Sequence, residues 1–195
     1  MTRGHTPATS SGRFHRPAGR VLGLLLAAVL LAACAQSSAR PAGGQFQSGT
    51  AGDVAPDAVR LRLAGFAGGP GFRVPEDLGG RPLVLNVWAS WCGPCRSEMP
   101  ALQQVYLQAK DKVAFLGLDS RDVQDAARRF AAQTGVTYPL AADPNGQAAA
   151  KLGVAGLPTT VFIAADGTLR GRHVGALTPS ELRAAISRCL RVSVP

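Results

Sequence analysis

Two kinds of hydrophobic pattern alternate along the later part of this 195-residue chain. Short apolar runs predict buried strands at 83–88 and 113–118, and alternating apolar and basic residues predict a half-exposed strand at 59–63. Apolar residues also recur at helical spacing after Cys92, and these are Met99, Leu102, Val105 and Tyr106. They predict a helix that begins directly after the strand 83–88.

Further elements are expected towards the C-terminus. A short edge segment is expected at 136–140, and helices are expected at 122–134, 145–152 and 180–191. The dipeptide Asp166-Gly167 separates the apolar run 156–164 from a strand at 168–174, which is a strong hairpin signal. Strands that alternate with helices predict an α/β domain with a central sheet.

The reactive residues are concentrated in Trp91-Cys92-Gly93-Pro94-Cys95, between the strand 83–88 and the following helix. A helix N-terminus offers unpaired N–H groups and the positive end of the helix dipole, and both favour a thiolate over a thiol. We therefore expect a lowered pKa for Cys92, which would attack a disulfide, while Cys95 would resolve the mixed disulfide. Gly93 and Pro94 set the turn between them.

A CxxC pair has two other interpretations, a zinc site and a purely structural disulfide. Zinc needs further ligands, and the remaining cysteines and histidines form no second ligand pair: Cys34, Cys189, His5, His15 and His173. A structural disulfide between neighbouring cysteines would close too short a loop to stabilise much by chain entropy. Redox chemistry is therefore favoured, with no metal and no cofactor, and Cys189 is expected to be a buried or idle thiol.

Residues 1–33 have the organisation of an export signal. The first 20 residues carry four arginines and no acid, and a 13-residue apolar run follows at 21–33. This run is short for a membrane-spanning helix, which needs about 20 residues, and is typical of a secretory signal peptide. The sequence Leu31-Ala32-Ala33-Cys34 resembles a bacterial lipobox, which implies cleavage and a lipid on Cys34. The alternative is an ordinary signal peptidase site, with Cys34 incidental.

Residues 34–56 are rich in Ala, Gly, Ser, Gln and Pro, a composition that predicts a flexible tether before a folded domain at 57–195. The net charge of +9 is scattered, and no basic run is interleaved with aromatic residues. Nucleic acid is therefore not an expected partner. A lipid anchor would hold the domain at the outer face of the cytoplasmic membrane, where disulfides persist.

The stretch Val87-Trp88-Ala89-Ser90-Trp91-Cys92-Gly93-Pro94-Cys95 resembles the active-site strand and turn of thioredoxin-like proteins. The resemblance covers roughly residues 52–192. An N-terminal strand and an inserted strand and helix are similar to those of one subgroup, the membrane-anchored TlpA/ResA-like thiol-disulfide oxidoreductases. This resemblance implies an α/β thioredoxin-like fold, with helices on both sides of a mixed sheet, an N-terminal strand extension and an inserted strand-helix.

The resemblance also implies roles outside the CxxC pair. The matching proline of the family is cis and faces the cysteines, so Pro158 is expected there, with the backbone of Leu157 binding an extended substrate. Trp91 is expected to pack beside the disulfide at the substrate site. Glu98 lies on the helix face of the second cysteine and matches a glutamate that tunes cysteine pKa values and moves protons. Asn86 stands where thioredoxin has a buried aspartate, which favours Glu98 as the proton handler.

The function that the resemblance implies is disulfide reduction outside the cytosol. The expected partners are protein thiols and disulfides, such as the CxxCH segment of apocytochrome c during cytochrome c maturation, and a membrane thiol carrier of the CcdA type that supplies electrons. The alternative is an oxidase that forms disulfides in secreted proteins, and the reduction potential decides between them. Peroxide reduction is less favoured, because Ala89 stands where a peroxiredoxin needs threonine. The intact CxxC pair argues against a non-enzymatic binding module.

Overall fold

The structure is a computed structural model that describes residues 45–47 and 58–195. The expected leader at 1–33 and the lipidation site at Cys34 lie outside the described residues. The expected tether at 34–56 is described only at 45–47. In the described part of the chain, no helix combines the length and the apolar character that crossing a membrane requires.

A mixed sheet of eight strands, in the order β1-β8-β7-β4-β5-β6-β2-β3, is the centre of the described residues. The strands are β1 (Gln45–Gln47), β2 (Leu61–Gly65), β3 (Phe72–Val74), β4 (Leu83–Trp88), β5 (Ala114–Ser120), β6 (Leu140–Asp143), β7 (Thr159–Ile163) and β8 (Leu169–Val174). The pairs β4–β5 and β5–β6 are parallel, and the other pairs are antiparallel. The carboxyl ends of β4 and β5 therefore meet at one edge of the sheet, where Trp88 pairs with Asp119.

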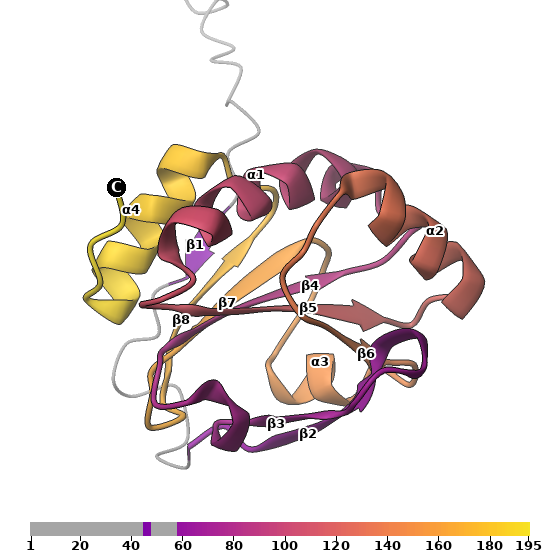
Figure 1. Ribbon diagram of the computed structural model, residues 1–195, viewed down its shortest axis with the longest axis horizontal. Coiled ribbons are helices and arrows are strands. Elements are labelled where there is room, and N and C mark those ends of the chain that lie inside the picture. The colour runs from indigo at the N-terminus through magenta and orange to yellow at the C-terminus, as the bar shows by residue number, and fades with distance from the viewer. Residues whose placement is uncertain (1–44, 48–57) are drawn as a thin grey trace, which may run out of the picture. The chain divides into compact units, whose positions relative to one another are not determined.

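Helices cover both faces of the sheet (Figure 1). The helices are α1 (Gly93–Ala109), α2 (Gln124–Thr134), α3 (Gln147–Lys151) and α4 (Pro179–Leu190), and two short 3-10 turns are η1 (Phe66–Gly68) and η2 (Glu76–Leu78). Helices α1 and α4 pack with Val84, Phe115 and Phe162 on one face, whereas α3 packs on the other face with Leu85 and Leu116. Because successive side chains of a strand point to opposite faces, the fully buried strands β4, β5 and β7 contribute to both cores.

The fold expected from the sequence is confirmed in its two additions to a thioredoxin-like core. The N-terminal extension is the hairpin of β2 and β3, which joins the sheet through β6. The inserted strand and helix are β6 and α3, between α2 and β7. The prediction of an edge segment at 136–140 is wrong in position and in pairing. The strand begins at Leu140, and it lies inside the sheet between β5 and β2. Pro139 lacks a backbone N–H and directly precedes the strand, although its carbonyl accepts from the Gly117 amide of β5 over 2.9 Å.

One strand lies where the sequence predicted only a tether. Residues Gln45–Gln47 form β1, which pairs antiparallel with β8, from Gln45 opposite Val174 to Gln47 opposite Arg172. A sheet edge presents unpaired N–H and C=O groups, which can pair with any extended segment that reaches it. Composition alone could not predict this pairing, because backbone groups of β8 supply it.

Candidate active site

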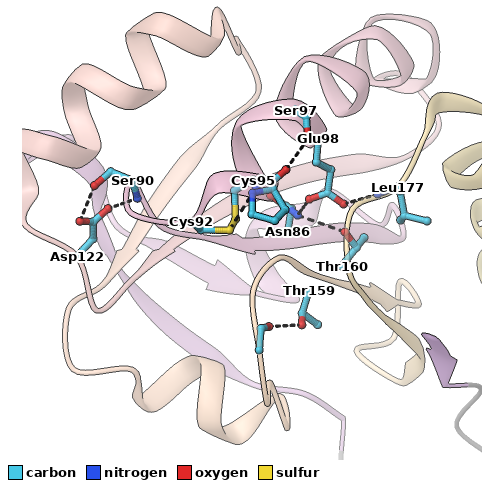
Figure 2. The surroundings of a disulfide bond; sticks show 12 residues. Asn86, Ser90, Cys92, Cys95, Ser97, Glu98, Asp122, Thr159, Thr160 and Leu177 are labelled. Carbon is cyan, nitrogen blue, oxygen red and sulfur yellow. Dashed lines mark hydrogen bonds between the residues drawn. A yellow bond between two sulfur atoms is a disulfide. The ribbon is translucent and has the colours of Figure 1, made fainter. Parts of the chain in front are cut away.

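A disulfide between Cys92 and Cys95 lies at the N-terminus of α1, with an S–S distance of 2.01 Å (Figure 2). Cys92 is the N-cap residue, and its Sγ accepts a hydrogen bond from the Cys95 amide over 3.2 Å. Pro94 fits the first turn because its missing N–H would have had no partner there. The same amide would stabilise a Cys92 thiolate after reduction, as the sequence predicted.

The two sulfurs differ in accessibility. Both cysteines are buried, but Cys92 is 4% exposed and Cys95 is 0% exposed, so Cys92 is the cysteine that retains some surface for a partner. Around them, apolar side chains from α1, α2 and the end of β4 form a cluster that includes Trp88, Met99 and Phe130. Trp88 stacks on Phe130 with ring centroids 5.4 Å apart. This arrangement favours Cys92 as the attacking sulfur and Cys95 as the resolving one.

The segment before β7 is distant from the cysteines in sequence but contacts the disulfide cluster. Leu157 packs against that cluster, and the Leu157–Pro158 peptide bond is cis, as the resemblance implied. Pro158 is buried, and its carbonyl accepts from the Gly175 amide over 2.9 Å. Leu157 itself precedes the first residue of β7 and is half-buried. Its backbone therefore lies outside the β7 ladder, where an extended client could approach it.

Trp91 was expected to pack beside the disulfide, but it is not part of the buried cluster around the cysteines. Its side chain is 64% exposed, and its indole Nε1–H donates to the carbonyl of Arg121 over 3.3 Å. Together with Leu157, it lines a groove of about 320 Å³ whose lining is Trp91, Ser120, Arg121, Gly146, Ala149, Ala150, Val154, Ala155, Gly156 and Leu157. An exposed indole beside a groove is well suited to contact a partner, because it offers a large apolar surface with little loss of side-chain entropy.

Glu98 is buried beneath the disulfide turn, at 1% exposure (Figure 2). One carboxylate oxygen accepts from the Asn86 amide Nδ2 over 2.8 Å, and the other accepts from the backbone amide of Leu177 over 3.0 Å. Asn86 Nδ2 also lies 3.2 Å from the hydroxyl of Thr160, which can accept from it. Burial raises the pKa of Glu98 to about 7, although its hydrogen-bond donors oppose that rise. A carboxyl with this pKa can both take and give a proton near neutral pH.

A second buried carboxyl, Asp119, was not singled out from the sequence. It is the residue before the last of β5, is 5% exposed, and its Oδ1 has no hydrogen-bond partner among the described residues. Burial raises its pKa to about 7, and the charges of Asp122 and Asp143 add to the rise. An aspartate at the carboxyl end of a predicted buried strand, beside the strand that carries the cysteines, was the available signal.

Asp122 connects this carboxyl to the cysteine loop. It accepts hydrogen bonds from the backbone amide and, over 2.8 Å, from the hydroxyl of Ser90, which precedes the CxxC turn (Figure 2). It also accepts from the Val123 amide over 2.7 Å. Asp122 was expected to cap a helix, but the N-cap residue of α2 is Val123, and the Asp122 carboxylate binds the active-site loop.

The described residues contain no group of three or more histidine, cysteine, aspartate or glutamate side chains arranged to hold a metal ion. Asp143, the third acid of this region, is used structurally. Its oxygens accept from the amides of Ala148 and Ala149, both over 3.0 Å, and from the Ser120 hydroxyl over 3.1 Å. Cys189 is a free, half-buried thiol on α4, and burial raises its pKa.

Comparisons with known proteins agree with a redox role for the Cys92–Cys95 pair. The Redoxin family model matches residues 50–186. The chain is 32% identical over 114 residues to the thiol-disulfide oxidoreductase ResA of Bacillus anthracis, which covers 58% of this chain and 66%, just under two thirds, of that protein. It is 36% identical over 154 residues to the thiol:disulfide interchange protein DsbE of Vibrio cholerae, covering 78% of this chain and 80% of that protein.

Solved structures extend the similarity to the fold. A DsbF homologue from Corynebacterium diphtheriae superposes with a TM-score of 0.65 at 30% identity, over 76% of this chain and 95% of that chain. The matched regions contain the CxxC turn, the following helix and the segment around Pro158. The chain therefore belongs to the Redoxin family, with relatives of the ResA, CycY and DsbE type.

Proposed function

We propose that the protein is a thiol-disulfide oxidoreductase that reduces disulfides in proteins outside the cytosol. The observation that carries the proposal is the Cys92–Cys95 pair at the N-terminus of α1, with only Cys92 accessible and a groove next to it. The relatives named thiol-disulfide oxidoreductase and thiol:disulfide interchange protein support this activity. Reduction is favoured over oxidation because Gly-Pro between the cysteines resembles the reducing thioredoxin pair.

The reaction is a two-electron exchange. The Cys92 thiolate attacks one sulfur of a client disulfide, and the other client sulfur leaves as a thiolate and takes up a proton. The Cys95 sulfur, once deprotonated, then attacks the Sγ of Cys92. This step releases the second client thiol and leaves the Cys92–Cys95 disulfide, so the client gains two electrons. A thiol donor must reduce the pair again before the next cycle.

Glu98 is the residue we propose for proton transfer in the second step. It lies one helical turn after Cys95, and its pKa near 7 allows it to accept the proton that the Cys95 thiol must lose. Its donors, the backbone amide of Leu177 and the side-chain amide of Asn86, hold the charged carboxylate in one position. Glu98 would therefore act as the general base that takes the Cys95 proton during attack on the mixed disulfide.

The proposed setting follows from the export signal in residues 1–33 and the lipobox-like Cys34. We infer that the mature protein is a lipoprotein on the outer face of the cytoplasmic membrane. There the client would be a protein with a disulfide to open, such as the CxxCH segment of apocytochrome c. The electron donor would be a membrane thiol carrier of the CcdA type.

The test is the reduction potential of the Cys92–Cys95 pair, measured by equilibration with thiol buffers. The full chain would carry Cys34→Ser and Cys189→Ser, so that only the pair exchanges. A potential near that of thioredoxin, about −270 mV, or below it is expected for a reductant. A potential near about −120 mV would show a disulfide donor and overturn the reductase proposal. Cys92→Ser in the same chain should abolish exchange; full function in that variant would favour a binding protein instead.

A further inference from the structure

We propose that Arg121 makes the groove beside the disulfide selective for client segments that carry a carboxylate side chain close to the reacting cysteine. The inference rests on the proposed function, since it names the clients of the same site. It concerns an extended protein segment as the occupant of the groove, with its acidic side chain directed towards the guanidinium.

The backbone of Arg121 is held in place on both sides of the groove. It follows β5 in the left-handed region, with φ 55°. Its amide donates to the carbonyl of Asp143 over 3.2 Å, and its carbonyl accepts from the indole of Trp91 over 3.3 Å. Arg121 is thus tied to the exposed tryptophan that lies next to Cys92. The Cα position of Arg121 is therefore fixed relative to Cys92.

Among the described residues that line the groove, Arg121 is the only charged one. The other lining residues are small, apolar or aromatic, with one serine, so the floor can accept an apolar side chain but offers no second charge. Helix α3, part of the inserted strand and helix, supplies Ala149 and Ala150 to this lining. The chemistry of the groove therefore matches a segment with one apolar and one acidic side chain.

The guanidinium is available for such a contact. Among the described residues, Arg121 makes no ion pair, and two acids near it, Asp122 and Asp143, have other partners. Asp122 binds Ser90, and Asp143 binds the amides at the start of α3. The Arg121 side chain crosses Gly146, where a Cβ would come within 2.1 Å of the guanidinium Nε. A planar guanidinium in this position can bind a carboxylate through two parallel hydrogen bonds.

The expected preference is modest, because Arg121 is exposed. Exposed ion pairs contribute little free energy and are screened by salt, so an acidic residue should speed client exchange by about threefold to fivefold at low ionic strength. A lysine at the same client position should slow exchange by a similar factor. The selectivity would act on the choice among clients, not on the chemistry at the sulfurs.

The test uses peptides that contain one cysteine as a mixed disulfide with mercaptoethanol, which is uncharged. Glutamine is replaced by glutamate at each of three positions on either side of the cysteine, one peptide per position. Reduced full-length protein with Cys34→Ser and Cys189→Ser attacks each peptide, and the rate of mercaptoethanol release is measured. We expect one position, or two neighbouring ones, at which the glutamate peptide reacts about threefold to fivefold faster than the glutamine peptide.

Two substitutions and one control identify Arg121 as the cause. Arg121→Gln should bring the glutamate-to-glutamine rate ratio to about one, and Arg121→Glu should bring it below one. Arg62→Gln removes the same charge from an exposed position on β2, outside the groove lining, and should keep the wild-type ratio. If Arg121→Gln does not fold, raising the salt on the wild-type chain serves instead, since screening should reduce the ratio.

The outcomes separate this inference from the proposed function. A flat scan in the wild-type chain, or a preference that survives Arg121→Gln or high salt, overturns the role of Arg121 while exchange itself continues. Absence of exchange with every peptide overturns the proposed function, and this inference with it. A preference for the glutamate peptide at one position, lost in Arg121→Gln and reversed in Arg121→Glu, supports both the proposed function and the role of Arg121.

Discussion

Two buried carboxyl groups near the disulfide reach the same pKa through different surroundings. Burial raises the pKa of Glu98 and the pKa of Asp119 to about 7. Glu98 is surrounded by donors, the Leu177 amide and Asn86 Nδ2, which stabilise its charged form. Asp119 is surrounded by acids, and the charges of Asp122 and Asp143 oppose its ionisation.

The difference shows that an identical pKa does not imply an identical role. A group that gives and takes a proton in each cycle needs its charged form stabilised in the core, and the two donors of Glu98 supply this. Asp119 has an oxygen without a partner among the described residues, and its like-charged neighbours favour the neutral form. With a pKa of about 7 it titrates near neutral pH, and its protonated form can donate to Asp122, which itself holds the Ser90 loop.

The largest expected effect is on stability, when each carboxyl is removed entirely. Glu98→Ala leaves the Leu177 amide without its acceptor in the core and opens a cavity, so we expect a loss of about 3 kcal/mol in the free energy of unfolding. Asp119→Ala leaves no buried backbone amide of the described residues without its acceptor, and should cost about 1 kcal/mol. Urea unfolding at pH 6, where both carboxyls are mostly protonated, measures the difference. Equal losses would contradict the comparison.

The pH dependence of stability tests both carboxyls together. A carboxyl whose folded pKa is raised binds a proton that the unfolded chain has released, so stability is greatest below the unfolded pKa and falls as pH rises towards the folded value. Between pH 5 and pH 8, each group should lower the free energy of unfolding by about 2–3 kcal/mol. Glu98→Gln and Asp119→Asn should each remove about half of the combined fall in the free energy of unfolding. Variants that keep the wild-type slope would show that the group does not titrate in this range.

A smaller expected effect separates the two carboxyls by their influence on the cysteines. Glu98 is one helical turn from Cys95, and its negative charge disfavours a thiolate. Glu98→Gln should therefore increase the rate of iodoacetamide labelling of the reduced pair at pH 7.5 by about fivefold. Asp119→Asn, the matched control, should change the rate by less than about twofold. A larger response to Asp119→Asn would transfer the proton-handling role to that residue.

The smallest expected effect concerns the link between Asp122 and the active-site loop. Ser90→Ala removes the 2.8 Å hydroxyl bond to Asp122 but keeps the backbone bond from the same residue. We expect a loss of about 1 kcal/mol in the free energy of unfolding. Thr160→Val, which removes the buried acceptor of Asn86, is the matched change in the Glu98 network and should cost somewhat more. A reversed order would show that the Asp122 contact is the more important one.

Local patterns predicted much of the fold. The buried strand β4, the turn of the cysteines and the start of α1 were predictable, because they depend on neighbouring residues: an apolar run, a proline suited to a first turn and cysteines at a helix start. The helix-face position of Glu98 was predictable for the same reason. The hairpin around Asp166-Gly167 followed from turn chemistry.

The remaining features depend on contacts between distant residues. Leu177 donates to Glu98 across a sequence separation of 79 residues, and nothing in the sequence around either residue indicates the pairing. The N-cap residue of α2 is Val123 and not Asp122, whose carboxylate binds Ser90. Strand β1 formed where composition predicted a tether, because the edge of β8 was open to pairing. Tertiary structure overrode local preference in each case.

The hydrogen bond from the Leu177 amide to Glu98 makes one backbone group a natural reporter. Leu177 lies in the loop before α4, and its N–H points at a carboxyl whose titration is otherwise hidden in the core. The proton chemical shift of that amide should move as Glu98 ionises, with no label on the glutamate. A two-dimensional nitrogen–proton NMR spectrum recorded against pH, for the oxidised and the reduced chain in turn, would then read the protonation state of the buried acid through each half of the redox cycle.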